Sequence, residues 1–489
     1  MQTEQSHEPS RPRFSKQEKW LLLLFLLSLP LVNPWVRGDG VGYYAYVRSI
    51  LIDHDIRFEN DWLAANPSFL ESRIDSNGHL LPDQYTPTGY VGNHFSVGPS
   101  LLWSPVIASV HGVVLALDRF GARIPADGYS PPYLISMAVT TAIYGFLGLW
   151  LSFLVARKYV GARWAMAATL GIWWASSLPV YMYFNPSWSH AHSAFGVALF
   201  LWYWDRTRSK RSLVQWVFLG LIAGLMADIY YPNAILLLLP GVESMAAVSG
   251  VSDGQDQRRR ASAALLANWT LFGVAFVVAL LPTLVTRKIL YGTFTASGYR
   301  PIASWNWTSP VFAKVLFSSD HGLFSWTPIL LLAAIGLLLL WKRDRLLSGS
   351  LILVFLAYFY FIASYPDWDG LSSYGNRFFI SLTPLFILGL AALFGALGDW
   401  MKSQKRAVAL AGATIGLLVI WNVGFIFQWG THLVPARGPI SWSQMTKNQF
   451  VVVPARISHS VKTYLTRRSS MMEQIEQQDI QQQGHSGDN

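Results

Sequence analysis

The sequence predicts an all-α polytopic membrane protein with a bundle of about 11 transmembrane helices, and three observations lead to this prediction. Hydrophobic residues make up 52% of the 489 residues and charged residues only 13%, about half the charged share of a soluble domain. The mean hydropathy is +0.31. The apolar residues also come in runs, and a membrane-spanning helix needs roughly 20 such residues. These features exclude an ordinary cytosolic enzyme and a disordered chain.

The sequence contains no cysteine, which excludes disulfides, thiol nucleophiles, iron–sulfur clusters and thiolate zinc sites. Its formal net charge is +10. In a membrane protein, an excess of Lys and Arg first indicates topology, because these residues are retained on the cytoplasmic side. We therefore expect a lipid bilayer around the chain and no nucleic-acid partner.

The chain begins with a polar segment, residues 1–19, that contains four basic residues. An apolar run from Trp20 to Val36 follows, without the small-residue cleavage site that ends a signal peptide. We interpret this run as an uncleaved first span with a cytoplasmic N-terminus. Residues 37–98 then form a polar first outer loop that holds eight acidic residues against four arginines.

Further apolar runs are distributed along the rest of the chain. They lie near 99–117, 133–155, 164–184, 191–204, 213–230, 234–249, 266–285, 322–341, 350–364, 378–398 and 407–429. Basic clusters lie between these runs. They are all on the same side of the membrane as the N-terminus only if the run 99–117 makes no net crossing. That run contains Pro99, Pro105 and His111, which is typical of an interfacial or re-entrant helix.

This arrangement gives 11 crossings within a transmembrane domain of residues 20–429. The C-terminal tail, residues 430–489, then lies on the outer side. The tail contains six basic residues, and a cytoplasmic tail would change the crossing count by one. The last 20 residues are rich in Gln, a composition that predicts disorder.

Asp39 follows the first span and is flanked by Gly38 and Gly40. A plain turn explains this pattern, because Gly-Asp-Gly is good turn chemistry. The functional interpretation is a catalytic general base at the outer membrane surface, where flanking glycines let a substrate approach closely. The next stretch, Val41–Ile52, has a pattern that predicts an amphipathic interfacial helix with Tyr43 on its apolar face.

Three histidines and one arginine lie at or near the starts of apolar runs on the same outer side, namely His94, His190, His321 and Arg377. Helix N-termini favour anions, and donor or positive side chains at that position fit a phosphate. Taken singly, each histidine is explained as a capping or interfacial residue, and Arg377 as a side chain that reaches to the interface. Four such groups on one side of the membrane favour a shared substrate-binding site.

The sequence points to no definite cofactor, and a divalent cation is the one candidate. His190 and His192 are two residues apart, so they do not share a helix face as a zinc pair would. Asp367 and Asp369 offer oxygen ligands to a divalent cation, with a solvated loop as the alternative.

Short motifs give the chain a resemblance to a known group. They are Gly38-Asp39-Gly40-Val41-Gly42-Tyr43-Tyr44, Asn93-His94-Phe95-Ser96-Val97-Gly98-Pro99-Ser100, Ser319-Asp320-His321-Gly322-Leu323-Phe324-Ser325-Trp326-Thr327-Pro328 and Gly375-Asn376-Arg377-Phe378-Phe379. With these motifs and its layout, the chain resembles the GT-C superfamily of membrane glycosyltransferases over roughly residues 20–430. Within that superfamily it is most similar to bacterial glycosyltransferase-39-like and lipid A aminoarabinose-transferase-like proteins.

The resemblance implies a GT-C-like bundle in the bacterial inner membrane with its active site on the outer face. It implies a sugar donor on a polyprenyl phosphate, a hydroxyl acceptor on a lipid, glycan or protein, and inversion at the anomeric carbon. Asp39 matches the acidic residue that the family places after its first span. In relatives, a Lys-Pro-Pro segment contacts the donor phosphate; that segment is absent from this chain, and His94 lies near its place. The family often has Glu at the position of Gly40.

Three functions follow as hypotheses. The first is a polyprenyl-phosphate-dependent glycosyltransferase in which Asp39 is the base, and His94, His190, His321, Arg377 and Tyr43 bind the substrate and its phosphate. The second is a polysaccharide polymerase or ligase that uses polyprenyl-diphosphate glycans. The third is a transporter or flippase for a lipid-linked sugar. A transporter would have buried charges along several spans, whereas the polar groups here gather on the outer face of the membrane, which disfavours this hypothesis.

Overall fold

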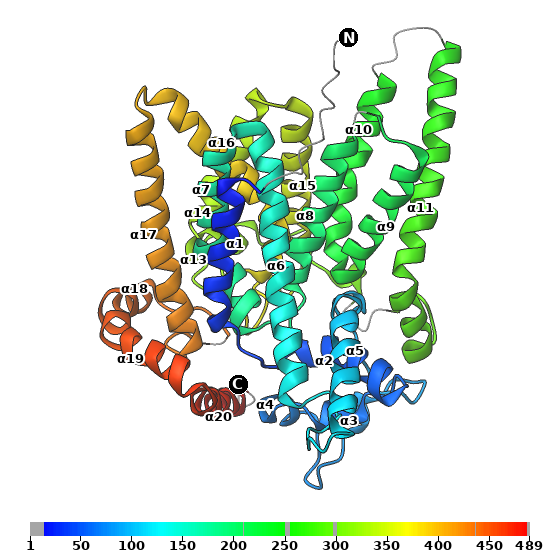
Figure 1. Cartoon of the computed structure of the whole chain (residues 1–489), viewed down its shortest axis with the longest axis vertical. Coiled ribbons are helices and arrows are strands. Elements are labelled where there is room, and N and C mark those ends of the chain that lie inside the picture. The colour runs from blue at the N-terminus through cyan, green and yellow to red at the C-terminus, as the bar shows by residue number, and fades with distance from the viewer. Residues whose placement is uncertain (1–13, 209, 250–254, 297–300, 436, 487–489) are drawn as a thin grey trace, which may run out of the picture.

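The computed structural model describes residues 14–208, 210–249, 255–296, 301–435 and 437–486. Within these residues the chain is helical and contains no strand, apart from two isolated bridges, Ile74–Leu80 and Tyr85–Val91. The predicted all-α class is therefore confirmed. The helices stand side by side along the long axis of the molecule, and short helices cover one end (Figure 1).

The N-terminal part contains the predicted first span and outer loop. Its elements are α1 (Lys16–Ser28), η1 (Leu29–Leu31), α2 (Asp39–Arg48), η2 (Ser49–Asp53), α3 (Glu59–Leu63), α4 (Pro67–Leu70), η3 (Pro82–Gln84), α5 (Gly98–Asp118) and α6 (Pro131–Val160). The short helices α2, α3 and α4 lie at the lower end of the molecule in Figure 1. The expected amphipathic helix over Val41–Ile52 is instead α2 followed by η2, and α2 is buried from Gly40 to Arg48 because α5 and residues 93–97 cover it.

The middle of the chain supplies most of the bundle. Its elements are α7 (Ala162–Ala175), η4 (Val180–Phe184), α8 (His190–Thr207), α9 (Leu213–Ile229), η5 (Tyr231–Leu237), α10 (Leu238–Ser249), α11 (Gln255–Tyr291), η6 (Ile302–Ser304), α12 (Phe312–Phe317), α13 (Leu323–Trp326), α14 (Ile329–Leu339) and η7 (Leu340–Lys342).

The C-terminal part adds three long apolar helices and a more polar tail that is also helical. Its elements are α15 (Arg345–Ser364), η8 (Arg377–Leu382), α16 (Thr383–Trp400), α17 (Gln404–Gly430), α18 (Trp442–Lys447), η9 (Asn448–Val452), α19 (Val453–Thr466) and α20 (Arg468–Ser486).

Seven helical segments among the described residues are long and apolar enough to cross a membrane. They are Gly98–Asp118, Pro131–Val160, Tyr231–Ser249, Ser262–Tyr291, Arg345–Ser364, Arg377–Trp400 and Gln404–Gly430. Two shorter apolar segments are Leu213–Ile229 and Ile329–Lys342. The chain is thus polytopic.

The remaining predicted spans fall on α1, α7 and α8, which are shorter or less apolar. The run that was expected not to cross the membrane, residues 99–117, forms a continuous 21-residue helix, α5. This helix lies at the lower end of the molecule beside α2 (Figure 1).

The core of the bundle lies around α16, whose spanning segment is the most buried of the seven. In Figure 1, α17 and α11 stand at opposite edges, and their spanning segments are largely uncovered by protein. The backbones of α14 and α16 approach closely at two glycines. A Cβ atom added to Gly336 would lie only 1.9 Å from the carbonyl oxygen of Gly389. Small residues that let two backbones approach in this way are typical of helix pairs in membranes.

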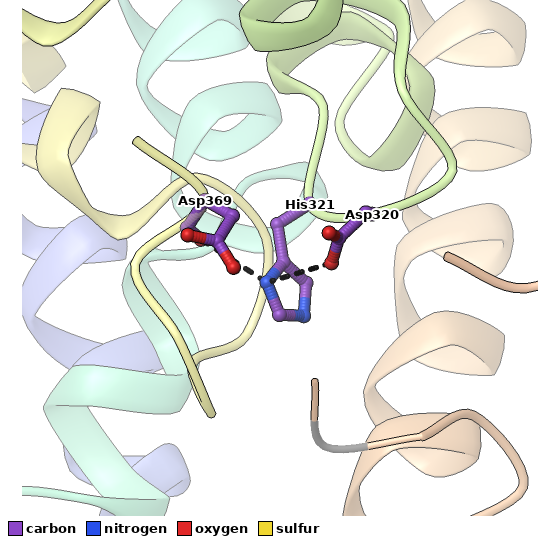
Figure 2. Close-up of side chains that lie close together, drawn as sticks. All are labelled: Asp320, His321 and Asp369. Atoms are coloured by element: carbon purple, nitrogen blue, oxygen red, sulfur yellow. Dashed lines mark hydrogen bonds and ion pairs between the residues drawn. The ribbon is translucent and has the colours of Figure 1, made fainter. Parts of the chain in front are cut away.

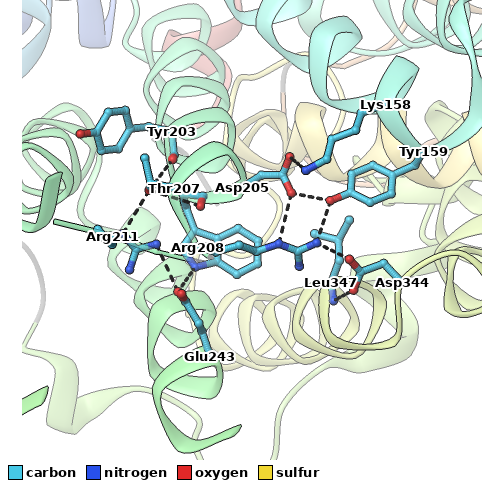
Figure 3. Close-up of polar contacts among 11 residues, drawn as sticks. Lys158, Tyr159, Tyr203, Asp205, Thr207, Arg208, Arg211, Glu243, Asp344 and Leu347 are labelled. Carbon is cyan, nitrogen blue, oxygen red and sulfur yellow. Dashed lines mark hydrogen bonds and ion pairs between the residues drawn. The ribbon is translucent and has the colours of Figure 1, made fainter. Parts of the chain in front are cut away.

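A network of charged side chains around the buried Asp205 joins α6, α8 and the start of α15 (Figure 3). Lys158 Nζ lies 2.8 Å from the Asp205 carboxylate, and Arg208 Nε lies 3.5 Å from it. Arg208 also pairs with Asp344, the N-cap of α15. Asp205 is near the C-terminal end of α8, and His190 is its first residue. The network therefore lies at the opposite end of α8 from the site described below.

The C-terminal tail packs on the outer loop. Glu476 of α20 accepts hydrogen bonds from Asn66 Nδ2 at 2.8 Å and from the Ser68 backbone N–H at 2.6 Å. The last 20 residues were expected to be disordered, but the structure has a helix there, α20, that extends to Ser486. Composition could not reveal this helix, because its partners are more than 400 residues away in the sequence.

Candidate functional site

Asp39 is the first residue of α2, and the glycines on either side of it fit where other residues would not. Gly38 has a positive φ of 54°, and a Cβ atom there would lie 2.9 Å from the Trp188 ring. A Cβ atom on Gly40 would lie 1.9 Å from Ser187 Oγ. The expected turn therefore occurs, and it is the segment before α8, not a substrate, that approaches these two glycines closely.

Asp39 forms an ion pair with Arg377, the first residue of η8. Arg377 Nη1 lies 2.5 Å from Asp39 Oδ2, and the Arg377 guanidinium stacks 4.4 Å from the centre of the Trp188 ring. The Arg377 side chain is 10% exposed, whereas the Asp39 side chain is 32% exposed. The cation is thus held inside the protein, and the carboxylate remains within reach of a molecule outside it.

Tyr43 lies one helical turn after Asp39 and is buried. Its hydroxyl accepts a hydrogen bond of 3.0 Å from Ser189 Oγ. Burial, and then the negative charge of Asp39, raise the pKa of Tyr43 above its ordinary value. Tyr43 is therefore a neutral phenol beside the carboxylate.

His94 lies in the segment between η3 and α5. Its backbone carbonyl accepts hydrogen bonds from Arg287 Nη2 at 2.6 Å and from the Tyr231 hydroxyl at 3.2 Å. Burial lowers the pKa of His94 to about 4, and the Asp39 carboxylate acts in the opposite direction. At neutral pH the imidazole is uncharged, so His94 offers a phosphate a neutral ring and not the positive charge.

His321 lies in the turn between α12 and α13 and is buried. Its Nδ1 contacts the backbone carbonyl of Asp369 at 3.1 Å, and its ring lies 4.8 Å from the Trp326 ring. Burial lowers the pKa of His321 to about 4, and the positive charge of Arg377 adds a smaller shift in the same direction. This second imidazole is also neutral at pH 7.

His190 opens α8 within a group of aromatic rings. Its ring centre lies 4.7 Å from that of Tyr181 and 6.1 Å from that of Trp188. Trp188 therefore touches both His190 and Arg377. His192 instead packs against Trp103 at 4.9 Å, so the two histidines enter different surroundings, as their spacing predicts.

The structure brings the six predicted site residues into one neighbourhood. Asp39 binds Arg377 directly and influences the ionisation of Tyr43 and His94. Arg377 shares Trp188 with His190 and influences the ionisation of His321. Only Arg377 among the predicted phosphate-binding residues supplies a positive charge at neutral pH.

Sequence reasoning missed two residues of this neighbourhood. Trp188 supports the Arg377 guanidinium and donates from its indole Nε1 to the Arg37 carbonyl at 2.9 Å. Arg287, in the last turns of α11, holds the segment that carries His94. An arginine inside an apolar run is a signal that could have found Arg287, whereas Trp188 is one of 22 tryptophans and its role depends on packing.

An apolar cavity of about 250 Å³ lies next to the site. It is an open cavity lined by the ends of η1 and α17 and by α19 and α20, with side chains that include Leu31, Phe184, Phe427, Val461, Tyr464 and Met472. Arg37, two residues before Asp39, and Asp479 line its polar part and form an ion pair. The lining is thus mostly apolar, with polar groups at the end near the start of α2.

One group in the described part of the chain has ligands suited to a metal. One ligand atom each from Asp320, His321 and Asp369 lies within 4.8 Å of the others (Figure 2). Asp369 was a candidate from the sequence, and its partners are Asp320 and His321 instead of the expected Asp367.

Together, the helices and the site define a polytopic helical membrane protein with a carboxylate–guanidinium pair at one end of its bundle. No model of a known protein family matches the chain, and no curated protein matches it in sequence. Among solved structures, the chain is similar to ArnT from Cupriavidus metallidurans in the apo state, with a TM-score of 0.44 and 13% sequence identity. The similarity covers 85% of this chain and 72% of that chain. A likeness this distant carries no argument about activity, which has to come from the residues themselves.

Proposed function

We propose that this chain is a membrane glycosyltransferase that moves a sugar from a polyprenyl-phosphate donor to a hydroxyl group of a lipid, glycan or protein acceptor. The observation that carries the proposal is the Asp39–Arg377 pair: a reachable carboxylate held at 2.5 Å by a buried guanidinium. A transferase of this kind needs both a base for the acceptor and a fixed positive charge for the phosphate that leaves.

In the proposed reaction, the acceptor oxygen attacks the anomeric carbon of the sugar and its proton passes to Asp39. The bond between the anomeric carbon and the phosphate oxygen breaks, and its electron pair leaves with the polyprenyl phosphate. Attack opposite to the leaving group inverts the configuration at that carbon. Arg377 stabilises the negative charge of the phosphate, while the neutral His94, His190 and His321 and the Tyr43 phenol surround the sugar and phosphate as hydrogen-bonding groups.

The ion pair also gives the base a means of control. While Asp39 Oδ2 accepts a hydrogen bond from Arg377, that oxygen is occupied and cannot take the acceptor proton. A donor phosphate that binds Arg377 competes for the same N–H groups. The Oδ2 atom is then released only when the donor is in place, which limits proton transfer without substrate.

The apolar cavity supports a lipid-linked substrate. Its lining is largely hydrocarbon and aromatic, and Arg37 connects it to the start of α2. A substrate on a polyprenyl chain remains in the bilayer, so its phosphate must meet the protein at the membrane interface. The end of the bundle that carries Asp39, with its neighbouring cavity, meets that requirement.

The proposed location is the bacterial inner membrane, with the N-terminus in the cytoplasm and the site at the outer face. Arg157 pairs with Glu18 of α1, Lys158 with Asp205, and Arg343 with Asp399. These basic residues lie at the ends of α6 and α14 that are remote from the site, and the positive-inside rule assigns such an end to the cytoplasm.

The test is to incubate the purified protein with a panel of polyprenyl-phosphate sugars and membrane-derived acceptors, and to measure free polyprenyl phosphate and glycosylated product by mass spectrometry. We expect one equivalent of polyprenyl phosphate for each sugar transferred. A ladder of lengthening products would point to the polymerase alternative. Movement of a labelled lipid-linked sugar from one leaflet of a liposome membrane to the other, without cleavage of its glycosidic bond, would contradict the proposal and favour a transporter.

A further inference from the structure

Asp320, His321 and Asp369 form a cluster between two turns that are distant in the sequence. Asp320 and His321 lie between α12 and α13, and Asp369 lies between α15 and η8. Figure 2 shows the three side chains meeting where these two turns face each other. One ligand atom of each lies within 4.8 Å of the other two.

The Asp320 carboxylate has an unsatisfied position inside this cluster. Its Oδ1 atom is buried and has no hydrogen-bond partner within the described structure. His321 Nδ1 lies 3.8 Å from this oxygen and forms no hydrogen bond with it. Burial of a carboxylate oxygen without a compensating partner is unfavourable. Asp369 adds a second carboxylate, so the cluster has more negative than positive charge.

The His321 ring is held in a fixed orientation. Its Nδ1 contacts the Asp369 carbonyl at 3.1 Å, and the ring packs edge-on against Trp326 at 4.8 Å. Metal-binding histidines are commonly held in this way, with one ring nitrogen on a backbone carbonyl. The guanidinium of Arg377, whose charge acts on both His321 and Asp369, already pairs with Asp39.

We propose that Asp320, His321 and Asp369 bind one divalent cation through two carboxylates and one imidazole. Carboxylates suit Mn²⁺ and Mg²⁺, whereas imidazole suits Zn²⁺ and its neighbours. The mixed set therefore favours Mn²⁺ or Zn²⁺ over Mg²⁺ or Ca²⁺. Three protein ligands leave further coordination positions open to water or to an anion.

Binding an ion requires the three ligand atoms to move closer together. Ligand atoms at about 2.0–2.2 Å from an ion lie about 3.3–3.6 Å apart in a tetrahedral site and at most about 4.4 Å apart when they face each other across the ion. The three ligand atoms lie within 4.8 Å of one another, so the widest separation must shorten by about 0.4 to 1.5 Å. Both acidic residues lie in turns outside the long helices.

The test uses the full-length protein in detergent, freed of metal with a chelator and then titrated with Mn²⁺ alone. Free Mn²⁺ is followed by its electron paramagnetic resonance signal, with no sugar donor or acceptor present, so the outcome is independent of the proposed reaction. We expect one Mn²⁺ per chain, displaced by Zn²⁺ but not by an equal concentration of Mg²⁺. Asp320→Asn and His321→Gln should each weaken binding at least tenfold, and Asp367→Asn, a change in the same loop as Asp369, should not.

A second measurement needs no variant. Mn²⁺ bound to the wild-type chain should show a ¹⁴N coupling from a directly bound imidazole in electron spin echo spectra. The proposal is overturned if the wild-type chain takes up no Mn²⁺ at millimolar concentration, if the bound ion shows no nitrogen coupling, or if folded Asp320→Asn protein binds as tightly as wild type.

Discussion

Arg377 donates a hydrogen bond of 2.5 Å to Asp39 across 338 positions of the sequence. The contact joins the start of α2 to the start of η8, and Trp188 from a third segment supports the guanidinium. The Asp39 side chain, which is 32% exposed, is thereby held by the Arg377 side chain, which is only 10% exposed. Donor binding, proton transfer and the control of the base are all expected to depend on this pair.

The first prediction concerns Arg377. Arg377→Gln should lower sugar transfer about 10²- to 10³-fold, the usual effect of losing one donor that stabilises a developing negative charge. Arg377→Lys should retain part of the activity, since it keeps the charge but loses the planar fork and the stacking on Trp188. Initial rates at varied donor concentration measure both changes. Arg437→Gln removes an exposed arginine at the same end of the molecule and serves as the control; an equal loss there would contradict a specific role for Arg377.

The second prediction concerns the glycine after Asp39. Gly40→Ala places a Cβ atom 1.9 Å from Ser187 Oγ, so the start of α2 must move and transfer should fall at least tenfold. The double variant Gly40→Ala, Ser187→Gly removes the clash and should recover most of the activity. Gly273→Ala, in α11 with no atom nearby, should have no effect. If the double variant is no more active than the single one, the close approach is not what positions Asp39.

The third prediction is a pH dependence that arises from His94. Burial lowers the pKa of His94 from 6.5 to about 4, so between these values the unfolded chain binds a proton that the folded chain does not. The free energy of unfolding should therefore fall as the pH is lowered from 6.5 to 4, with no contribution to the slope above pH 6.5. His94→Asn should flatten this slope in thermal unfolding measured across that range. The exposed His79 of the same loop provides the matched variant, His79→Asn, and a slope that only this second change flattens would refute the assignment.

The fourth prediction concerns the tail. Glu476→Ala leaves the Ser68 N–H and the Asn66 amide without their carboxylate, at a cost of about 1–3 kcal/mol for the loss of charged hydrogen bonds. The tail should then be cut faster by a protease added at low concentration, and the melting temperature should fall. Glu473→Ala changes an exposed glutamate of the same helix and should leave the cleavage rate unchanged. Equal cleavage of the two variants would mean that Glu476 does not hold α20 in place.

The sequence allowed the helical class and the polar end of the bundle to be predicted because both follow from local patterns. Apolar runs indicate spanning helices, and the positions just after or before such runs indicate which groups lie at an interface. The same logic placed Asp39, His94 and Arg377 at one end. Their pairing could not be predicted, because it depends on how α2, η8 and the segment before α8 pack together.

Other features depended on distant partners in the same way. The neutral state of the His94 ring could not be predicted, because the burial that lowers its pKa is set by the fold. The end of the chain has a disordered composition but forms α20, since Glu476 and Asp479 meet residues of the outer loop and of the segment before Asp39. Arg287 was missed although an arginine in an apolar run is a recognisable signal.

The most direct test of the central claim is the rate of sugar transfer by Asp39→Asn, measured beside wild type and Asp39→Glu under single-turnover conditions with the donor prebound. Asparagine keeps the shape and removes the basic carboxylate. We predict a rate about 10²- to 10⁴-fold below wild type for folded Asp39→Asn protein that still binds donor, and a partial rate for Asp39→Glu. A folded Asp39→Asn protein that transfers sugar at the wild-type rate would contradict the role of Asp39 as the base.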